Sequence, residues 1–188
     1  MQGGEFRREA DTKYAHVIIA GEGAAGSNAK AVATQAVLLT ALANSSPVKF
    51  SDTTQGVIGK AAGSNASASA FQAIHSDSGL VGVYLVSEAA HVQNSVQSVY
   101  GALKSFKLDS IDAVKKQAYN NALRSRAHSE NYALERTAQL FQSKDYYIDH
   151  ILNVSASDVE TAAKTFTKRI TLASYGNISE VPFVDQLN

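Results

Sequence analysis

Two short runs of apolar and β-branched residues predict the central strands of a sheet. Residues 14–20 form one run (Tyr-Ala-His-Val-Ile-Ile-Ala) and residues 80–86 form the other (Leu-Val-Gly-Val-Tyr-Leu-Val). Runs of this length, bounded by glycine and polar residues, are typical of strands. A Ser-Asp-Ser-Gly turn at 76–79 joins the second run to residues 67–75, where small and apolar side chains alternate. This order predicts a β-hairpin, so part of the sheet is antiparallel.

Longer segments carry apolar residues at intervals of three and four, which predicts amphipathic helices. Ser27 or Asn28 is the expected N-cap of the first helix. Ser155 caps the last one, and Asp158 occupies the third helical position, where a carboxylate complements the helix dipole. The predicted helices cover residues 27–44, 88–106, 110–129, 132–142, 146–152 and 155–169, and residues 44–66 form a loop with weak helical character near 54–60.

The order of these elements predicts the fold class. A charged edge strand at 5–9 precedes the central run, and a last strand covers 170–174. Strands and helices fall into separate groups rather than alternating, which favours an α+β fold. We therefore expect one domain over residues 1–188, with a mixed, mostly antiparallel sheet and helices packed on one face.

Composition narrows the functional classes. The chain has 17 Lys and Arg and 17 Asp and Glu, so its net charge is zero, whereas a nucleic-acid surface needs a basic excess. It has no cysteine, which excludes disulfides and thiolate metal sites. No segment approaches the ~20 apolar residues of a membrane helix, and residues 1–5 resemble neither a signal peptide nor a transit peptide.

Residues 21–26 match the G-x-G-x-x-G pattern of a dinucleotide site, after a strand and before a helix. Two features oppose that interpretation. No parallel strand ending in an acidic residue follows the helix, and Glu22 would place a carboxylate beside the pyrophosphate. We therefore expect a structural turn and no cofactor. A dinucleotide-binding oxidoreductase remains an alternative that rests on the glycines alone.

Catalytic and metal residues are expected to be absent. A His-x-x-Glu-His zinc motif places two His ligands and a general base on one helix. The five histidines, His16, His75, His91, His128 and His150, are dispersed, and none has that neighbourhood. The string at 75–78 holds hydrolase residue types, but Asp, Ser and Gly in a row are typical of a turn. The basic residues Lys115, Lys116, Arg124 and Arg126 predict a solvated helix face beside Asp112 and Glu130; a contact surface for an acidic partner is the alternative. Tyr146 and Tyr147 predict anchors whose rings are buried and whose hydroxyls find hydrogen-bond partners.

Four motifs, in their order and spacing, resemble a known family. They are residues 3–5 (Gly-Gly-Glu), 22–25 (Glu-Gly-Ala-Ala), 76–80 (Ser-Asp-Ser-Gly-Leu) and 182–187 (Pro-Phe-Val-Asp-Gln-Leu). Together they resemble the C-terminal half of the core protein 2 family of mitochondrial ubiquinol–cytochrome c reductase, respiratory complex III. That family is built like the pitrilysin-type, or processing-peptidase-like, metallopeptidases but has lost their chemistry.

The resemblance implies a processing-peptidase-like α/β roll that forms the C-terminal half of a two-half subunit, with the N-terminal half and any targeting segment outside these residues. It implies a non-catalytic scaffold on the matrix side of the inner membrane, with no catalytic, cofactor-binding or metal residues. Its partners would be core protein 1, other complex III subunits and a second copy. The alternative is the non-zinc half of a processing-peptidase-like enzyme. Active relatives carry an Arg and Tyr that hold substrate, and residues 55–63 contain only Lys60.

Overall fold

A computed structural model describes residues 3–43, 56–108, 110–142 and 145–187. Its sheet has five strands in the order β1-β5-β2-β4-β3. Their bounds are β1 Gly4–Glu9, β2 Tyr14–Glu22, β3 Ala66–Ile74, β4 Gly79–Glu88 and β5 Thr171–Gly176. Only the β1–β5 pair is parallel among these strands. The prediction of a mixed, mostly antiparallel sheet in an α+β fold is confirmed.

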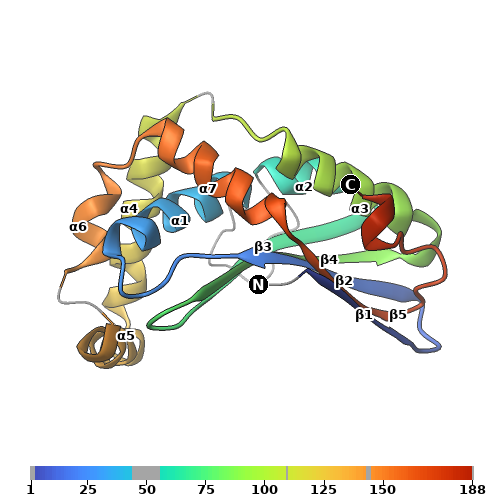
Figure 1. The fold of residues 1–188 in the computed structure, drawn as a ribbon, viewed down its shortest axis with the longest axis horizontal. Helices are drawn as coiled ribbons and strands as arrows, with labels where there is room; N and C mark the ends of the chain where they lie inside the picture. Colours follow the sequence, from blue (N-terminus) through green and yellow to red (C-terminus); the bar gives the residue numbers. More distant parts are fainter. Residues whose placement is uncertain (1–2, 44–55, 109, 143–144, 188) are drawn as a thin grey trace.

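Helices cover one face of this sheet, with α1, α2, α3 and α7 lying across it and α4 and α6 beside them (Figure 1). The described helices are α1 Ala29–Leu42, α2 Val57–Ala62, α3 Val92–Lys104, α4 Ile111–Ala127, α5 Ser129–Gln142, α6 Tyr147–Ile151 and α7 Ala156–Lys168, with short 3-10 turns at Ala89–His91 and Val184–Gln186. None of the helices within the described ranges is long and apolar enough to span a bilayer.

The two apolar runs lie in the interior of the sheet, as predicted. In β2, the side chains of Val17 and Ile19 are fully buried, and the register sets them opposite Leu85 and Val83 of β4. These alternate residues face the helices, where Phe166 of α7 and Leu38 of α1 join the same core. The period of two in the strands therefore sorts apolar residues onto the helix side.

Side-chain caps fix where two helices begin. The Asn28 carboxamide oxygen accepts a hydrogen bond from the Ala31 amide at 3.1 Å, which starts α1. The Ser155 hydroxyl accepts from the Asp158 amide, and the Asp158 carboxylate accepts from the Ser155 amide, each at 3.2 Å. The Ser155 hydroxyl also donates to that carboxylate, which lowers the pKa of Asp158. Both predicted N-caps are confirmed.

Some boundaries differ from those predicted. The helix expected at 132–142 begins at Ser129, directly after α4, and the last strand ends at Gly176 instead of residue 174. Gly176 has φ of 103°, which a glycine adopts without strain, and this conformation lets the chain leave the sheet. The weak helical character near 54–60 corresponds to α2, whereas residues 44–55 of the loop predicted at 44–66 lie outside the described residues.

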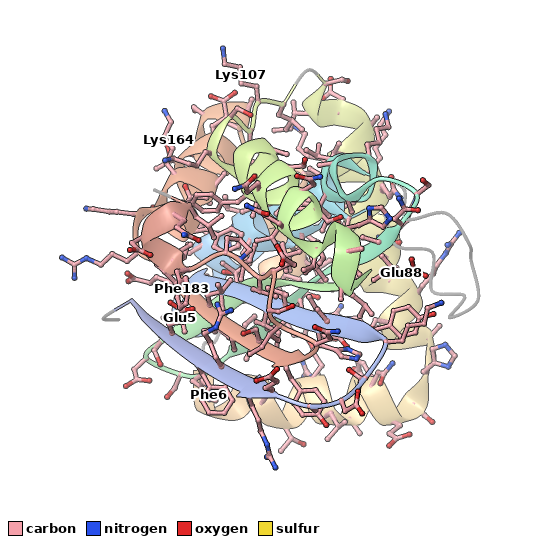
Figure 2. The ribbon with its side chains drawn as sticks, turned by 90° about the vertical axis from the view of Figure 1, so that its right-hand side faces the viewer. Glu5, Phe6, Glu88, Lys107, Lys164 and Phe183 are labelled. Carbon is pink, nitrogen blue, oxygen red and sulfur yellow. The ribbon has the colours of Figure 1, made fainter. Side chains whose placement is uncertain are left out.

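The segment after β5 is tied back to β1 through Arg7. Its guanidinium donates to the carbonyl oxygens of Ile178 and Val181, each at 2.9 Å, and to Glu5 at 2.9 Å. The guanidinium carbon also lies 4.3 Å from the ring centre of Phe183. Figure 2 shows Glu5 and Phe183 together on the helix side of β1, with Phe6 pointing the opposite way. One side chain thus joins two segments far apart in sequence.

Candidate interaction surface

The glycine-rich loop at 21–26 is built into the hairpin rather than left free. The amide of Gly23 donates to the Gly79 carbonyl at 2.9 Å, that of Gly26 to the His75 carbonyl at 2.7 Å, and that of Ser27 to the Ser76 carbonyl at 2.9 Å. A phosphate-binding loop needs such amides directed at its ligand. Here the three amides are used to attach the loop to the β3–β4 turn.

Close packing explains the glycines themselves. A Cβ at Gly21 would collide with the backbone oxygen of Phe166 in α7, and a Cβ at Gly79 with that of Ala24. A Cβ at Gly23 would lie 2.8 Å from the Leu80 carbonyl carbon. Each glycine lets one backbone segment approach another. Two of the three glycines in the pattern, Gly21 and Gly23, are therefore accounted for by the fold, which supports the prediction of a structural turn.

Gln35 braces the same loop and is a residue that the sequence pattern did not single out. Its side chain is only 4% exposed, yet it accepts from the Ala24 amide at 2.6 Å and donates to Gln72 of β3 at 2.8 Å. A buried amide needs such partners. The sequence feature that could have identified Gln35 is its position among the apolar residues of α1.

A cleft of about 1120 Å³ lies between this loop, the hairpin turn, α1 and α7. Its charged lining comes from different elements and carries both signs: Glu22, Lys30, Asp77 and Asp158. Asp158 is committed to the cap of α7, and Asp77 accepts from the Ser78 hydroxyl at 3.2 Å. The described part of the chain contains no group of three or more His, Asp or Glu side chains that could hold a metal ion.

We expect NAD(H) not to bind to this loop. Glu22 lines the cleft beside the loop, and the amides that a pyrophosphate would need already pair with the hairpin. Calorimetric titration of the purified chain with NADH should show no heat of binding. A dissociation constant in the micromolar range would contradict this prediction and revive the oxidoreductase alternative.

The five histidines lie on separate elements. His16 is on β2, His75 at the hairpin turn, His91 in the 3-10 turn before α3, His128 between α4 and α5, and His150 on α6. They are not brought together as the ligands of a zinc motif would be. The prediction that the chain has no catalytic, cofactor-binding or metal residues remains a prediction.

The basic residues of α4 do not all form a solvated face, and for Arg126 the prediction was wrong. Lys116 and Arg124 are exposed, as expected for a solvated helix face. The Lys115 side chain pairs with Asp112 at 3.4 Å but is only 17% exposed, so it also departs from the prediction. Arg126 instead pairs with Glu135 of α5, at 3.2–3.3 Å through two nitrogens, and lies 3.9 Å from the ring centre of Tyr146. The sequence pattern could not show this contact because α5 folds back on α4.

Tyr146 and Tyr147 lie between the helices as anchors, and both are partly buried. The Tyr146 hydroxyl is buried without a hydrogen-bond partner among the described residues, so the prediction that each hydroxyl finds a partner was wrong for Tyr146. Both pack against the core, and burial raises the pKa of Tyr147 to about 12. The guanidinium groups of Arg126 in α4 and Arg136 in α5 lie over the Tyr146 ring, so this residue connects the start of α6 to both helices.

The sheet face opposite the helices is the most distinctive exposed surface, and we call it the open face. The register places its side chains in two neighbouring rows. One row contains Phe6, Ala173, Ile18 and Tyr84, and the next contains Arg8, Tyr175, His16 and Val86. Phe6 is 61% exposed and Tyr175 46% exposed. Aromatic side chains gathered in this way mark a surface suited to contact with another protein.

His16 and Tyr84 organise the centre of the open face. The His16 ring nitrogen Nδ1 lies 2.6 Å from the Tyr84 hydroxyl, and the two rings stack with centres 6.1 Å apart. Tyr175 lies at the same centre-to-centre distance on the other side of His16. Their alternation with buried residues is visible in the sequence, but the pairing of His16 with Tyr84 depends on the β2–β4 register.

No family model matches the chain. Among curated proteins, mouse cytochrome b-c1 complex subunit 2, mitochondrial, is 31% identical over 201 aligned positions, which cover 99% of this chain and 44% of the mouse protein. The human protein of the same name is 28% identical over the same shares. The chain thus spans less than half the length of the curated relatives it matches.

Solved structures with the same fold include a chain of "Complex III2 from Candida albicans, Inz-5 bound". It has a TM-score of 0.75 and 16% identity and covers 98% of this chain and 48% of that one. The peptidase M16 inactive domain from Pseudomonas fluorescens gives a TM-score of 0.67 with 11% identity and covers 93% and 44%. Together with the sequence matches, this agreement leads to one conclusion: the chain is homologous to cytochrome b-c1 complex subunit 2, the core protein 2 of complex III, and has a peptidase M16-like fold.

Proposed function

We propose that the chain is the C-terminal half of a non-catalytic core subunit of mitochondrial respiratory complex III, needed for assembly and stability of the complex. The observation that carries the proposal is the 31% identity to subunit 2 of the mouse complex along 99% of this chain. The matching share is 44% of the relative, which fits one half of a two-half subunit. Its place is the matrix side of the inner membrane.

The open face supports this assignment. A half subunit leaves an interface between the halves uncovered, typically ~600–1,500 Å² in area. The aromatic rows around Phe6 and Tyr175 supply an exposed apolar surface of the kind such an interface needs. Core protein 1, other complex III subunits and a second copy of the chain are the proposed partners.

The alternative is the non-zinc half of a processing-peptidase-like enzyme. The shared fold with a peptidase M16 inactive domain is compatible with it, because a fold by itself does not fix a function. The two proposals differ in where the protein resides and what depends on it. An antibody to the chain should detect it at the position of complex III on native gels of mitochondria, and its depletion should lower the amount of assembled complex. Migration with a soluble peptidase instead would favour the alternative.

We expect the purified chain to contain no stoichiometric zinc and to cleave no mitochondrial presequence peptide. The histidines lie on separate elements, and no acidic group joins them in a metal site within the described ranges. Elemental analysis after extensive dialysis should give far less than one zinc per chain. One tightly held zinc per chain, or cleavage of the peptide that a chelator abolishes, would contradict the scaffold assignment.

A further inference from the structure

The two edges of the sheet are built differently. β1 forms one edge, and four of its six residues are charged: Glu5, Arg7, Arg8 and Glu9. Charges on an edge strand discourage pairing with another chain. β3 forms the other edge, and its nine residues (Ala-Ser-Ala-Ser-Ala-Phe-Gln-Ala-Ile) contain no charge, proline or glycine. The continuous register with β4 shows no bulge. By these criteria β3 is open to pairing.

The hairpin determines which backbone groups of β3 point outward. The His75 amide donates to the Ser78 carbonyl at 2.9 Å, so this pair next to the turn is hydrogen-bonded. Hydrogen-bonded and non-hydrogen-bonded pairs alternate in an antiparallel ladder. Residues 67, 69, 71 and 73 therefore bond to β4, and the amides and carbonyls of Ala66, Ala68, Ala70, Gln72 and Ile74 point away from it. Within the part of the chain that the structure describes, these outward groups have no hydrogen-bond partner.

The sequence of β3 is complementary to itself when two copies run antiparallel about Ala70. Phe71 then lies opposite Ser69 of the other copy, Gln72 opposite Ala68, and Ile74 opposite Ala66. Each large side chain meets a small one, and no like charges face each other. All five outward residues fall at hydrogen-bonded pairs, so every free amide and carbonyl on one strand finds a partner on the other.

The surroundings fit this register. Near the Gln72–Ile74 end, a cavity of about 360 Å³ separates β3 from Leu134, Glu135 and Ala138 of α5. The two-fold pairing brings Ala66 and Ala68 of the second copy, which have small side chains, to this end.

We propose that a second copy of this chain pairs with the free edge of β3, as an antiparallel two-fold contact centred on Ala70 that joins two sheets into one. The contact rests on the sheet register and does not depend on the complex III assignment. It is isologous, because the same edge serves on both sides. A single strand pair buries less than the ~1,200–2,000 Å² of a stable interface, so the dimer is weak and depends on concentration.

Single cysteines test the register, because the chain has no cysteine of its own. Ser67 and Ala73 of the other copy lie opposite each other at a non-hydrogen-bonded position, where Cα atoms are about 4.5 Å apart and a disulfide can form. Ser67→Cys and Ala73→Cys should each give little cross-linked dimer alone under mild oxidation. An equimolar mixture, with one variant carrying a mass tag, should give the mixed dimer in at least tenfold excess. Lys164→Cys, on the exposed face of α7, controls for random collision.

A second pair of variants tests the outward amide. Gln72→Pro removes the Gln72 amide hydrogen that the partner strand would accept, whereas Gln72→Ala keeps it, and both lose the same hydrogen bond to Gln35. Sedimentation equilibrium should show dimerisation weakened about tenfold or more in Gln72→Pro relative to Gln72→Ala, with both variants folded by circular dichroism. Equal self-association of the two variants, absence of the mixed disulfide, or a strictly monomeric chain would each overturn the proposal. Self-association that persists without the mixed disulfide would show that the two copies meet through another surface, such as the open face.

Discussion

Gly21→Ala is expected to destabilise the fold by about 3 kcal/mol or more, because the new methyl group would overlap atoms of α7. A Cβ at this position collides with the backbone oxygen of Phe166 and lies 2.7 Å from its ring. Phe166 lies in α7 and is fully buried in the hydrophobic core, so moving its backbone or its ring would disrupt the packing around it. Chemical denaturation of the purified variant, compared with the parent chain, measures the change in the free energy of unfolding.

Gly101→Ala is the matched control. Gly101 lies in α3, and a Cβ there meets no heavy atom within 4 Å. Alanine in an open helical position stabilises by ~0.5–1 kcal/mol relative to glycine. The two substitutions should therefore change stability in opposite directions. A Gly21→Ala protein as stable as its parent would show that α7 does not depend on this close approach, and would remove the structural explanation of the glycine-rich loop.

Arg7→Ala is expected to lower the free energy of unfolding by about 2–3 kcal/mol, because hydrogen bonds from a charged group are worth ~1.5–3 kcal/mol and their loss leaves acceptors unpaired. The Arg7 side chain is 21% exposed and donates to the Ile178 and Val181 carbonyls. Its removal also frees Phe183 from the guanidinium. Hydrogen exchange should become faster in the segment after β5 before it changes elsewhere.

Arg8→Ala provides the comparison on the adjacent residue. Arg8 is exposed on the open face and makes no ion pair or hydrogen bond within the described ranges. Its removal should change stability by less than ~0.5 kcal/mol, the usual range for a surface substitution. Arg7→Lys should recover only part of the loss, since an ammonium cannot reproduce the planar geometry of a guanidinium. Equal losses of stability in Arg7→Ala and Arg8→Ala would show that the hydrogen bonds of Arg7 do not hold the segment after β5 against β1.

Local patterns were enough to predict most elements of the fold. The period of two in β2 and β4, the turn residues between β3 and β4, and the Asn28 and Ser155 caps each specify structure within a few residues. The fold class followed from their grouping. Strand 5–9 was expected at an edge because of its charges, and β1 is an edge strand.

Long-range contacts account for what the sequence pattern could not predict. The position of β5 between β1 and β2 depends on residues about 160 positions apart. The Arg126–Glu135 ion pair depends on the turn between α4 and α5. The hydrogen bond from Gln35 to Gln72 forms only when β3 packs beside α1. For the open face, alternation indicated which residues share a side, but the His16–Tyr84 contact required the register.

The interior position of β5 has a consequence for synthesis. β1 and β2 are made before β5, yet both pair with β5 and not with each other. Contacts between residues so far apart in sequence are the slowest to form, because the loop between them must close first. Until β5 leaves the ribosome, β1 has no strand to join and one side of β2 stays bare. A chaperone that shields unpaired strands would therefore be needed until β5 has been made.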